Sequence, residues 1–429
     1  MGGAKCFLGA FYSGSTNYRR VRKRVCSLYT RLSKSESKAN MIMNKTVKYV
    51  LSGFAASLVG IGLSRFAYTP ATPYLISQGW LDENHIFWVG SANFLGYLIG
   101  AFLSPYILRF TSPRYALRLA FFMSGLSFLC CCYPYGSLWF MIWRFIVGLS
   151  GGVLTAVAAP FLLSAIDPKD RARSGGIMFS GVGLGLLLSA LFTPMIASIK
   201  VYYYWGALFL ITLIFFIITY RFIPNTNFEH NKKSYKSKRI DYFIYLTYGI
   251  NAAAFMPYIL FLVNFVLLRT IPSTYFAFII WLVYAFGAFL GTIILGIAAK
   301  KTSYCSVIFL MNFVQLFASF LLLLFPDLKI ALLLPALIMG AATPGIVPLY
   351  LGLIGELSSS DPQIQQIIWS RAVSAFALSQ AIAAYMFTWL FYIIENYILI
   401  FSISSFLLFI LCVGFIQERY YGYKQKKNH

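Results

Sequence analysis

A lone arginine lies in the middle of a long apolar stretch near the start of the chain. Arg65 belongs to the segment GIGLSRFAYTP, about midway between the nearest flanking charges, Lys48 and Asp82. An arginine at the centre of a membrane helix costs about 2.5–3.5 kcal/mol even on lenient insertion scales. We therefore expect Arg65 to face a protein interior or a watery cavity, where its guanidinium binds an anionic group. The alternative is a structural arginine that donates to carbonyls of a neighbouring helix.

A second arginine lies in another apolar run, within the motif Arg144-x3-Gly148-x2-Gly151-Gly152. At a rise of about 1.5 Å per residue, Arg144 is about 10 Å into its run, which is deep for an ordinary loop charge. The glycines allow a neighbouring helix to approach closely. Two interpretations therefore stay open: Arg144 binds or couples a substrate, or it holds helices together.

Neutral polar side chains occur in the same apolar runs, where they can form hydrogen bonds to a substrate. The candidates are Tyr68, Asn93, Tyr97, Asn251 and Gln380. Side chains of this kind also join membrane helices without touching any substrate. Both interpretations stay open for each of these residues.

The acidic residues exclude several kinds of chemistry. All 12 Asp and Glu residues, and all 3 His residues, fall at or near predicted loops or tails. No carboxylate pair, His–carboxylate cluster or Ser-His-Asp set can then form at membrane depth, so general acid–base and metal chemistry lack their usual groups. We expect no enzyme, no cofactor and no metal site. The unpaired arginines favour an anionic substrate group, most simply a carboxylate, which arginine binds through two parallel hydrogen bonds.

The composition indicates a polytopic membrane protein. The chain of 429 residues is 59% hydrophobic and only 11% charged, whereas a soluble domain is about 25% charged. The net charge of +23 resides in short clusters between apolar runs, which is typical of cytoplasmic loops and not of a nucleic-acid-binding face. We interpret the triplet Cys130-Cys131-Cys132, inside an apolar run, as membrane-embedded thiols.

Twelve apolar runs are each long enough to span a bilayer, for which about 20 helical residues suffice. They predict an all-α protein with twelve transmembrane helices in two six-helix bundles. The predicted spans are residues 47–77, 85–108, 114–134, 137–166, 173–197, 201–223, 242–268, 274–299, 303–325, 329–356, 366–390 and 393–417. The predicted parts are a basic, disordered cytoplasmic tail at 1–44, an N-terminal bundle at 45–223, a cytoplasmic linker at 224–240, a C-terminal bundle at 241–417 and a cytoplasmic tail at 418–429.

The distribution of Lys and Arg predicts the orientation. The loops on one side hold 14 Lys and Arg residues and those on the other side hold 3. Positive loops stay in the cytoplasm, so both ends of the chain are predicted to be cytoplasmic. Four arginines at the cytoplasmic ends of predicted helices are candidates for a gate: Arg109, Arg114, Arg171 and Arg371.

The two halves of the chain repeat one another weakly. Gly60-Ile61 before Pro70 in the first run matches Gly249-Ile250 before Pro257 in the seventh. Such a repeat is typical of transporters with two bundles and a site at mid-membrane between them. Arg65 has no counterpart in the second half, because the matching stretch reads Asn-Ala-Ala-Ala from residue 251. The predicted site is therefore asymmetric, and the first half holds its charge.

The chain resembles the major facilitator superfamily, and more narrowly its bacterial YbfB/YjiJ-like branch. The resemblance covers roughly residues 45–417, and its motifs are Gly62–Pro73 (GLSRFAYTPATP), Gly79-Trp80-Leu81, Ser91–Gly100 (SANFLGYLIG), Trp143–Gly148 (WRFIVG) and Gln380. It implies the major facilitator fold, alternating access by rocking of two bundles, and a bacterial inner-membrane location. The aspartate that the superfamily usually carries between its second and third helices is missing here, which puts a gate built on that carboxylate in doubt.

We expect a secondary transporter for a small organic anion or zwitterion. Its partners are the substrate, the lipid bilayer and, as an open alternative, a coupling proton or ion, and we expect a monomer. The second hypothesis is an efflux pump for hydrophobic drugs or a siderophore. A third, a transporter-like sensor, needs a folded tail, and the tails are short and polar.

Overall fold

The computed structural model describes residues 45–197, 200–223, 235–267, 273–358 and 362–427. These residues form helices and no strand. Residues Tyr49–His429 form one compact unit, and only this unit is considered below. The tail predicted at 1–44 and most of the linker, 224–234, lie outside the described residues.

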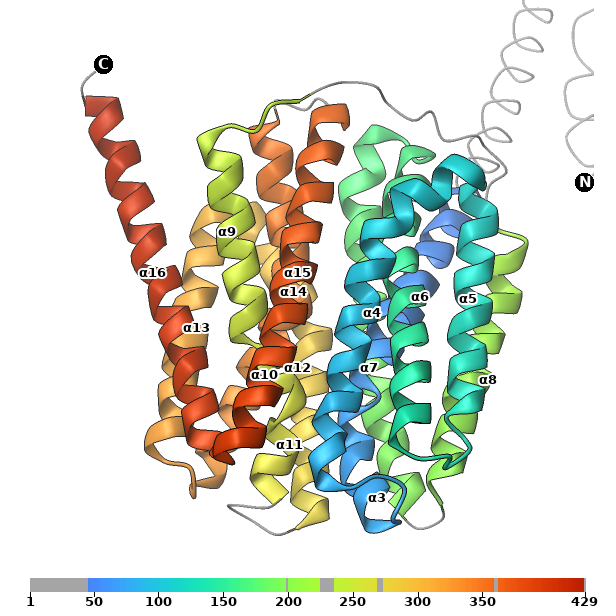
Figure 1. Ribbon diagram of the computed structural model, residues 1–429. Coiled ribbons are helices and arrows are strands. Elements are labelled where there is room, and N and C mark those ends of the chain that lie inside the picture. The colour runs from blue at the N-terminus through green and yellow to red at the C-terminus, as the bar shows by residue number, and fades with distance from the viewer. Residues whose placement is uncertain (1–44, 198–199, 224–234, 268–272, 359–361, 428–429) are drawn as a thin grey trace, which may run out of the picture. The chain divides into compact units, whose positions relative to one another are not determined.

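The helices follow one another with short connections (Figure 1). The first membrane helix, Lys45–Ser77, contains η1 (Leu58–Leu63), α2 (Ser64–Phe66), η2 (Thr69–Ala71) and α3 (Thr72–Ser77). The others are α4 (Glu83–Phe110), α5 (Pro113–Cys130), α6 (Ser137–Ser164), α7 (Pro168–Ala197), α8 (Val201–Tyr220), α9 (Arg239–Ala254), α10 (Met256–Leu260), α11 (Leu262–Phe265), α12 (Thr274–Lys301), α13 (Tyr304–Leu324), α14 (Lys329–Leu357), α15 (Pro362–Ile394) and α16 (Tyr397–Lys427).

Eleven helices in the described residues are long and apolar enough to cross a membrane. The predicted third span is the exception. It is α5, a helix of 18 residues with two arginines in its first two turns, Arg114 and Arg118, which lower its mean hydropathy. α5 runs beside α6 and α8 (Figure 1), so it occupies the place of a twelfth membrane helix.

The helices pack in two sets. In the first half α4 packs on α6, α5 on α6 and α8, and η1 on α7; in the second half α12 packs on α14, α13 on α14 and α16, and α9 on α15. α4 also contacts α15, and α7 contacts α12, so these pairs join the two halves. The ends of α4, α6 and α8 and the starts of α5, α7, α9 and α15 lie at one face, which we call the linker face. α3 ends and α4 starts at the opposite face, which we call the far face (Figure 1).

Glycines bring the helices of each half close together, and they do so in the same way in both halves. A Cβ added to Gly96 or Gly148 would clash with the backbone of α6 or α4, respectively. A Cβ added to Gly287 or Gly340 would clash in the same way between α12 and α14. Small residues allow such close backbone approach in membranes. The α4–α6 and α12–α14 pairs are therefore equivalent elements of an internal repeat.

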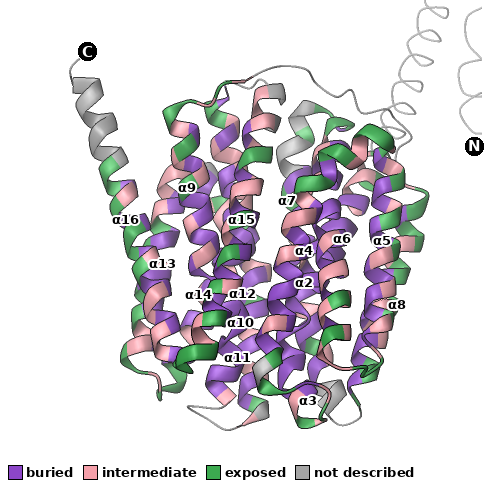
Figure 2. Ribbon diagram, in the orientation of Figure 1, coloured by how far each residue is buried: buried purple, intermediate pink, exposed green. Residues whose placement is uncertain are grey.

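Many large apolar side chains are exposed on the helices. Buried residues concentrate where the helices meet (Figure 2). Ile217 is 64% exposed and Phe317 is 61% exposed. In water such an apolar surface would be an interaction or aggregation site, and in a bilayer it contacts lipid. This pattern agrees with a multi-pass membrane protein.

Candidate functional site

Arg65 lies at a break in the first membrane helix. A π-helical turn, η1, precedes α2, and the 3-10 turn η2 with Pro70 follows it. The Arg65 side chain is only 4% exposed. π-turns often mark functional sites, because they change the direction in which the following side chains point.

The guanidinium of Arg65 is only partly satisfied. Its Nη1 donates to Oε1 of Gln380 on α15 at 2.6 Å, and the Tyr97 ring of α4 covers it, with the ring centre 3.5 Å from Cζ. Nε and Nη2 are buried and have no hydrogen-bond partner. These two atoms carry the parallel N–H groups of one guanidinium edge, which matches the two oxygens of a carboxylate.

Three neighbouring helices hold the backbone of this break. Asn93 on α4 donates to the Ser64 carbonyl at 3.1 Å, and Tyr204 on α8 donates to the Ala67 carbonyl at 2.6 Å. Arg144 on α6 approaches the Arg65 carbonyl with Nη2 at 3.5 Å. Asn93 also donates to the Arg144 carbonyl at 3.1 Å. Carbonyls freed by an irregular helix need such partners in a membrane, so these contacts fix the position of Arg65.

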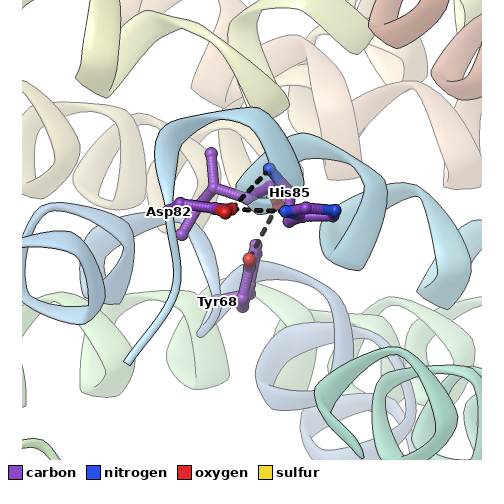
Figure 3. Close-up of polar contacts among 4 residues, drawn as sticks. Tyr68, Asp82 and His85 are labelled. Carbon is purple, nitrogen blue, oxygen red and sulfur yellow. Dashed lines mark hydrogen bonds and ion pairs between the residues drawn. The ribbon is translucent and has the colours of Figure 1, made fainter. Parts of the chain in front are cut away.

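Tyr68 fixes the same segment to the start of α4 (Figure 3). Its hydroxyl donates to the Ile86 carbonyl at 2.7 Å. Asp82 caps α4 by accepting from the backbone N–H of His85 at 3.1 Å, and it contacts the His85 ring at 2.5 Å (Figure 3). The hydrogen bond from His85 lowers the pKa of the Asp82 carboxyl below its ordinary value. A cap of this kind stabilises a helix start by about 1 kcal/mol.

A cavity of about 340 Å³ extends from Arg65 toward the linker face. Its inner end is lined by Arg65, Tyr97 and Gln380, and Trp369 and Arg371, near the start of α15, lie at its mouth. The volume is within the range of small-molecule sites. Of the described residues that line this cavity, none is Asp, Glu or His.

The two halves close against each other on the far face. Thr69 donates to the Ile259 carbonyl at 2.7 Å, and Ser91 donates to the Ala384 carbonyl at 3.2 Å and pairs with the Thr388 hydroxyl at 2.9 Å. Phe87 on α4 packs on two rings of the second half, Phe261 at 4.4 Å and Phe391 at 5.1 Å between ring centres. The cavity beside Arg65 therefore extends toward the linker face, and the contacts between the halves close the far face.

The structure separates the seven predicted binding residues into three groups. Arg65, Tyr97 and Gln380 meet at the inner end of the cavity. Tyr68, Asn93 and Arg144 bind backbone carbonyls and do not line it. Asn251 lies in a fully buried amide cluster, where its Nδ2 donates to Asn312 at 2.7 Å and to Gln315 at 2.9 Å. Direct substrate contact is thus best supported for the first group.

Of the predicted gating arginines whose side chains the structure describes, Arg109, Arg114 and Arg371, only Arg371 lines the cavity. It donates to the Ser237 hydroxyl at 2.7 Å and to the Tyr235 carbonyl at 3.1 Å, both at the end of the linker. Arg109 is exposed beside Tyr106 at the end of α4. Arg114 is half-buried in the first turn of α5. The side chain of Arg171 lies outside the described residues.

A wall of aromatic side chains in the cavity was not predicted from the sequence. Tyr248 on α9 packs on Phe376 and Trp369 of α15, with ring centres 4.4 and 6.1 Å apart, and all three line the cavity. On α15, Trp369, Val373, Phe376 and Gln380 follow helical spacing and share one face. This spacing ahead of Gln380 is the signal in the sequence that could have identified the wall.

Comparisons with known proteins agree with this architecture. Residues 57–415 match the sequence model of a family described as "Uncharacterised MFS-type transporter YbfB". The chain belongs to this family of the major facilitator superfamily. No curated protein matches the sequence. Among solved structures, a D-xylose–proton symporter has a similar fold, with a TM-score of 0.67 at 13% identity over 87% of this chain and 97% of that one.

Family and fold together identify the chain as a multi-pass membrane transporter, and the predicted superfamily and its YbfB-like branch are confirmed. The family match supports a secondary transporter, and the solved structure shows a similar fold. In the described part of the chain, no group of three or more His, Cys, Asp or Glu residues could hold a metal ion.

Proposed function

We propose that this transporter moves a small organic anion across the membrane by alternating access, with Arg65 as the residue that binds the anionic group. The observation that carries the proposal is the unsatisfied guanidinium edge at the inner end of the cavity. A buried donor without a partner costs about 1–3 kcal/mol, and more when charged. A carboxylate accepts from both N–H groups and also compensates the positive charge, whereas a neutral acceptor supplies hydrogen bonds without compensating the charge and a cation supplies neither.

The Arg65–Gln380 hydrogen bond links the proposed substrate site to both halves of the protein. Arg65 belongs to the first half and Gln380 to the second, and their bond spans the interface at 2.6 Å. Nε and Nη2 are buried, so a carboxylate reaches them only when Gln380 or Tyr97 shifts. Where Gln380 is the side chain that shifts, binding changes a contact between the two halves, as a transporter requires if the substrate is to influence their rocking.

The positive charge near the linker face indicates the orientation. Described basic residues at this face include Arg109, Arg118, Arg239, Lys301 and Arg371. By the positive-inside rule the linker face is cytoplasmic, so the cavity is open to the cytoplasm and the far face is closed. In this proposal the membrane is the bacterial inner membrane, and both ends of the chain are cytoplasmic.

A second function, efflux of hydrophobic compounds, is favoured by the aromatic wall of the cavity. In that case Arg65 serves only to join the halves through Gln380. The two functions differ in whether binding requires the charge of Arg65.

The test compares wild type with Arg65→Gln, and uses Arg109→Gln as a matched control at an exposed arginine. Thermal unfolding of the purified proteins is measured with organic acids, amino acids and hydrophobic cations. A ligand at 100 times its dissociation constant stabilises by about 2.7 kcal/mol. We expect an acid to stabilise wild type and Arg109→Gln but not Arg65→Gln. Stabilisation by hydrophobic cations that is equal in all three proteins would refute the anion site.

A further inference from the structure

The charge in the cavity is limited to its two ends. Arg65 lies at the inner end and Arg371 at the mouth, where Arg371 already donates to Ser237 and Tyr235. Gln380, the partner of Arg65, is nine residues after Arg371 on α15, which corresponds to about 13 Å along the helix. This separation of the backbone positions, together with the bonds of Arg371 to Ser237 and Tyr235, disfavours a small dicarboxylate that bridges both arginines. The inner end therefore suits a single negative charge.

Four of the five serine and threonine hydroxyls that line the cavity are bonded within their own helices, which leaves Ser370 and the hydroxyls of Tyr97 and Tyr248. Four of the lining hydroxyls donate to the carbonyl four residues earlier in the chain, at 2.7–2.9 Å: Ser104, Thr155, Thr343 and Ser374. Their protons are thus not available to a ligand. A sugar or other polyol needs many hydrogen-bonding partners when it leaves water, since each unpaired polar group is costly. These four hydroxyls cannot donate to it.

Acidic groups are absent from the described lining of the cavity. The ammonium group of an amino acid would therefore lose its hydration without gaining a carboxylate partner, which is unfavourable in a buried site. A zwitterion should bind much more weakly than the anion with the same carbon skeleton.

The aromatic wall supplies the remaining contact surface beside the arginine. Phe376 precedes Gln380 by four residues and lies one helical turn from it on the same face of α15. Tyr248 packs on Phe376 and lines the same cavity as Arg65. A ligand whose carboxylate reaches Arg65 thus places its next atoms against these two rings, where a flat apolar group gains most.

We infer that the substrate class is the monocarboxylates with a flat apolar body, such as aryl-alkanoates, because the cavity combines one unsatisfied arginine edge with an aromatic wall and self-bonded hydroxyls. This inference rests on the proposed function, since it names the anion that Arg65 binds.

The test is a panel of matched ligands on the full-length protein in lipid nanodiscs. The ligands are 3-phenylpropionate, phenylalanine, 3-phenylpropionamide, glutarate, propionate and D-xylose, and dissociation constants are obtained from thermal shifts and calorimetry. We expect 3-phenylpropionate to bind at least tenfold more tightly than the other five, and its binding to be lost in Arg65→Gln.

A wall variant tests the apolar half of the inference separately. Phe376→Leu should weaken 3-phenylpropionate by about two- to tenfold and leave propionate nearly unchanged, so the ratio of the two constants is informative even when the variant is less stable. Phe317→Leu, at a residue 61% exposed on α13, is the control and should change neither constant.

The outcomes separate the two proposals. Arg65-dependent binding that is tightest for glutarate, phenylalanine or propionate would overturn the substrate class and leave the anion transporter standing. Equal effects of Phe376→Leu on 3-phenylpropionate and propionate would also overturn the substrate class. Binding of 3-phenylpropionamide as tight as that of the acid, or no anion binding that depends on Arg65, would overturn both.

Discussion

Closure of the far face depends on a few hydrogen bonds between the halves, and removing them should shift the protein toward an open far face. Thr69→Val keeps the side-chain shape and removes the hydroxyl that donates to Ile259. Ser91→Ala removes the contacts to Ala384 and Thr388. All of these contacts join one half to the other, so they exist only while the far face is closed.

The size of the shift follows from the number of bonds. One such hydrogen bond contributes about 0.5–1.5 kcal/mol net, and 1.4 kcal/mol corresponds to a factor of 10 in an equilibrium constant. Thr69→Val, which removes one contact, should thus favour the open far face by about fivefold, and Ser91→Ala, which removes two, by at least as much. The double variant should favour it by about 25-fold or more if the sites act independently. A state populated at about 1% would rise to about 20%.

The measurement is the distance between spin labels at residues 77 and 327, on opposite halves at the far face. Both positions are exposed. We expect a second, longer distance to grow from wild type to single to double variant. The control is Thr212→Val, a buried threonine whose hydroxyl donates to Leu208 within α8. An unchanged distance distribution in the double variant would refute this account of the closure.

Two further predictions concern packing and the linker. Gly148→Ala places a Cβ against the Asn93 carbonyl, where backbone meets backbone. It should destabilise by about 1–3 kcal/mol, whereas Gly206→Ala, which has open space around it, should leave thermal unfolding unchanged or raise its midpoint. Arg371→Ala removes both contacts to residues 235–237, so limited trypsin digestion should cleave after Lys236 faster than in wild type; equal rates would show that Arg371 does not hold the linker end.

The same linker end contains a titratable pair outside the membrane. The Tyr235 hydroxyl donates to Asp241 at 2.9 Å, and Asp241 also accepts from the backbone N–H of Lys238 at 2.7 Å. Partial burial and the bond to Asp241 raise the pKa of Tyr235 to about 12. Tyr235 is therefore protonated at neutral pH and remains a donor, so the linker end stays attached to the start of α9.

Periodicity and composition allowed most of the fold to be predicted, because a bilayer tolerates few backbone arrangements. The apolar runs predicted the helices, and the glycines at 148, 151 and 152 indicated that another helix packs closely on α6. The third predicted span, α5, is less apolar than the other eleven, because Arg114 and Arg118 lie inside it.

For the candidate site, the sequence predicted how deep each residue lies in its apolar run, but not the direction in which its side chain points. The sequence states that Arg65, Arg144 and Asn251 lie at depth within apolar runs, but not where their side chains point. The π-turn before Arg65 changes the direction of the Arg65 side chain, and the residue types alone do not predict this turn. Arg144 is buried against the first helix, and Asn251 is buried among amides from α13.

The two buried arginines show why an unpaired charge is not sufficient to mark a binding residue. Both Arg65 and Arg144 have two guanidinium nitrogens without partners, so both are equally unsatisfied. Only Arg65 borders the cavity, and only Arg65 bonds to the opposite half of the protein. Arg144 bonds to the carbonyl of Arg65, so it helps to hold Arg65 in position. The position beside the cavity, and not the burial of the charge, is thus the observation by which the proposed function assigns binding to Arg65 and positioning to Arg144.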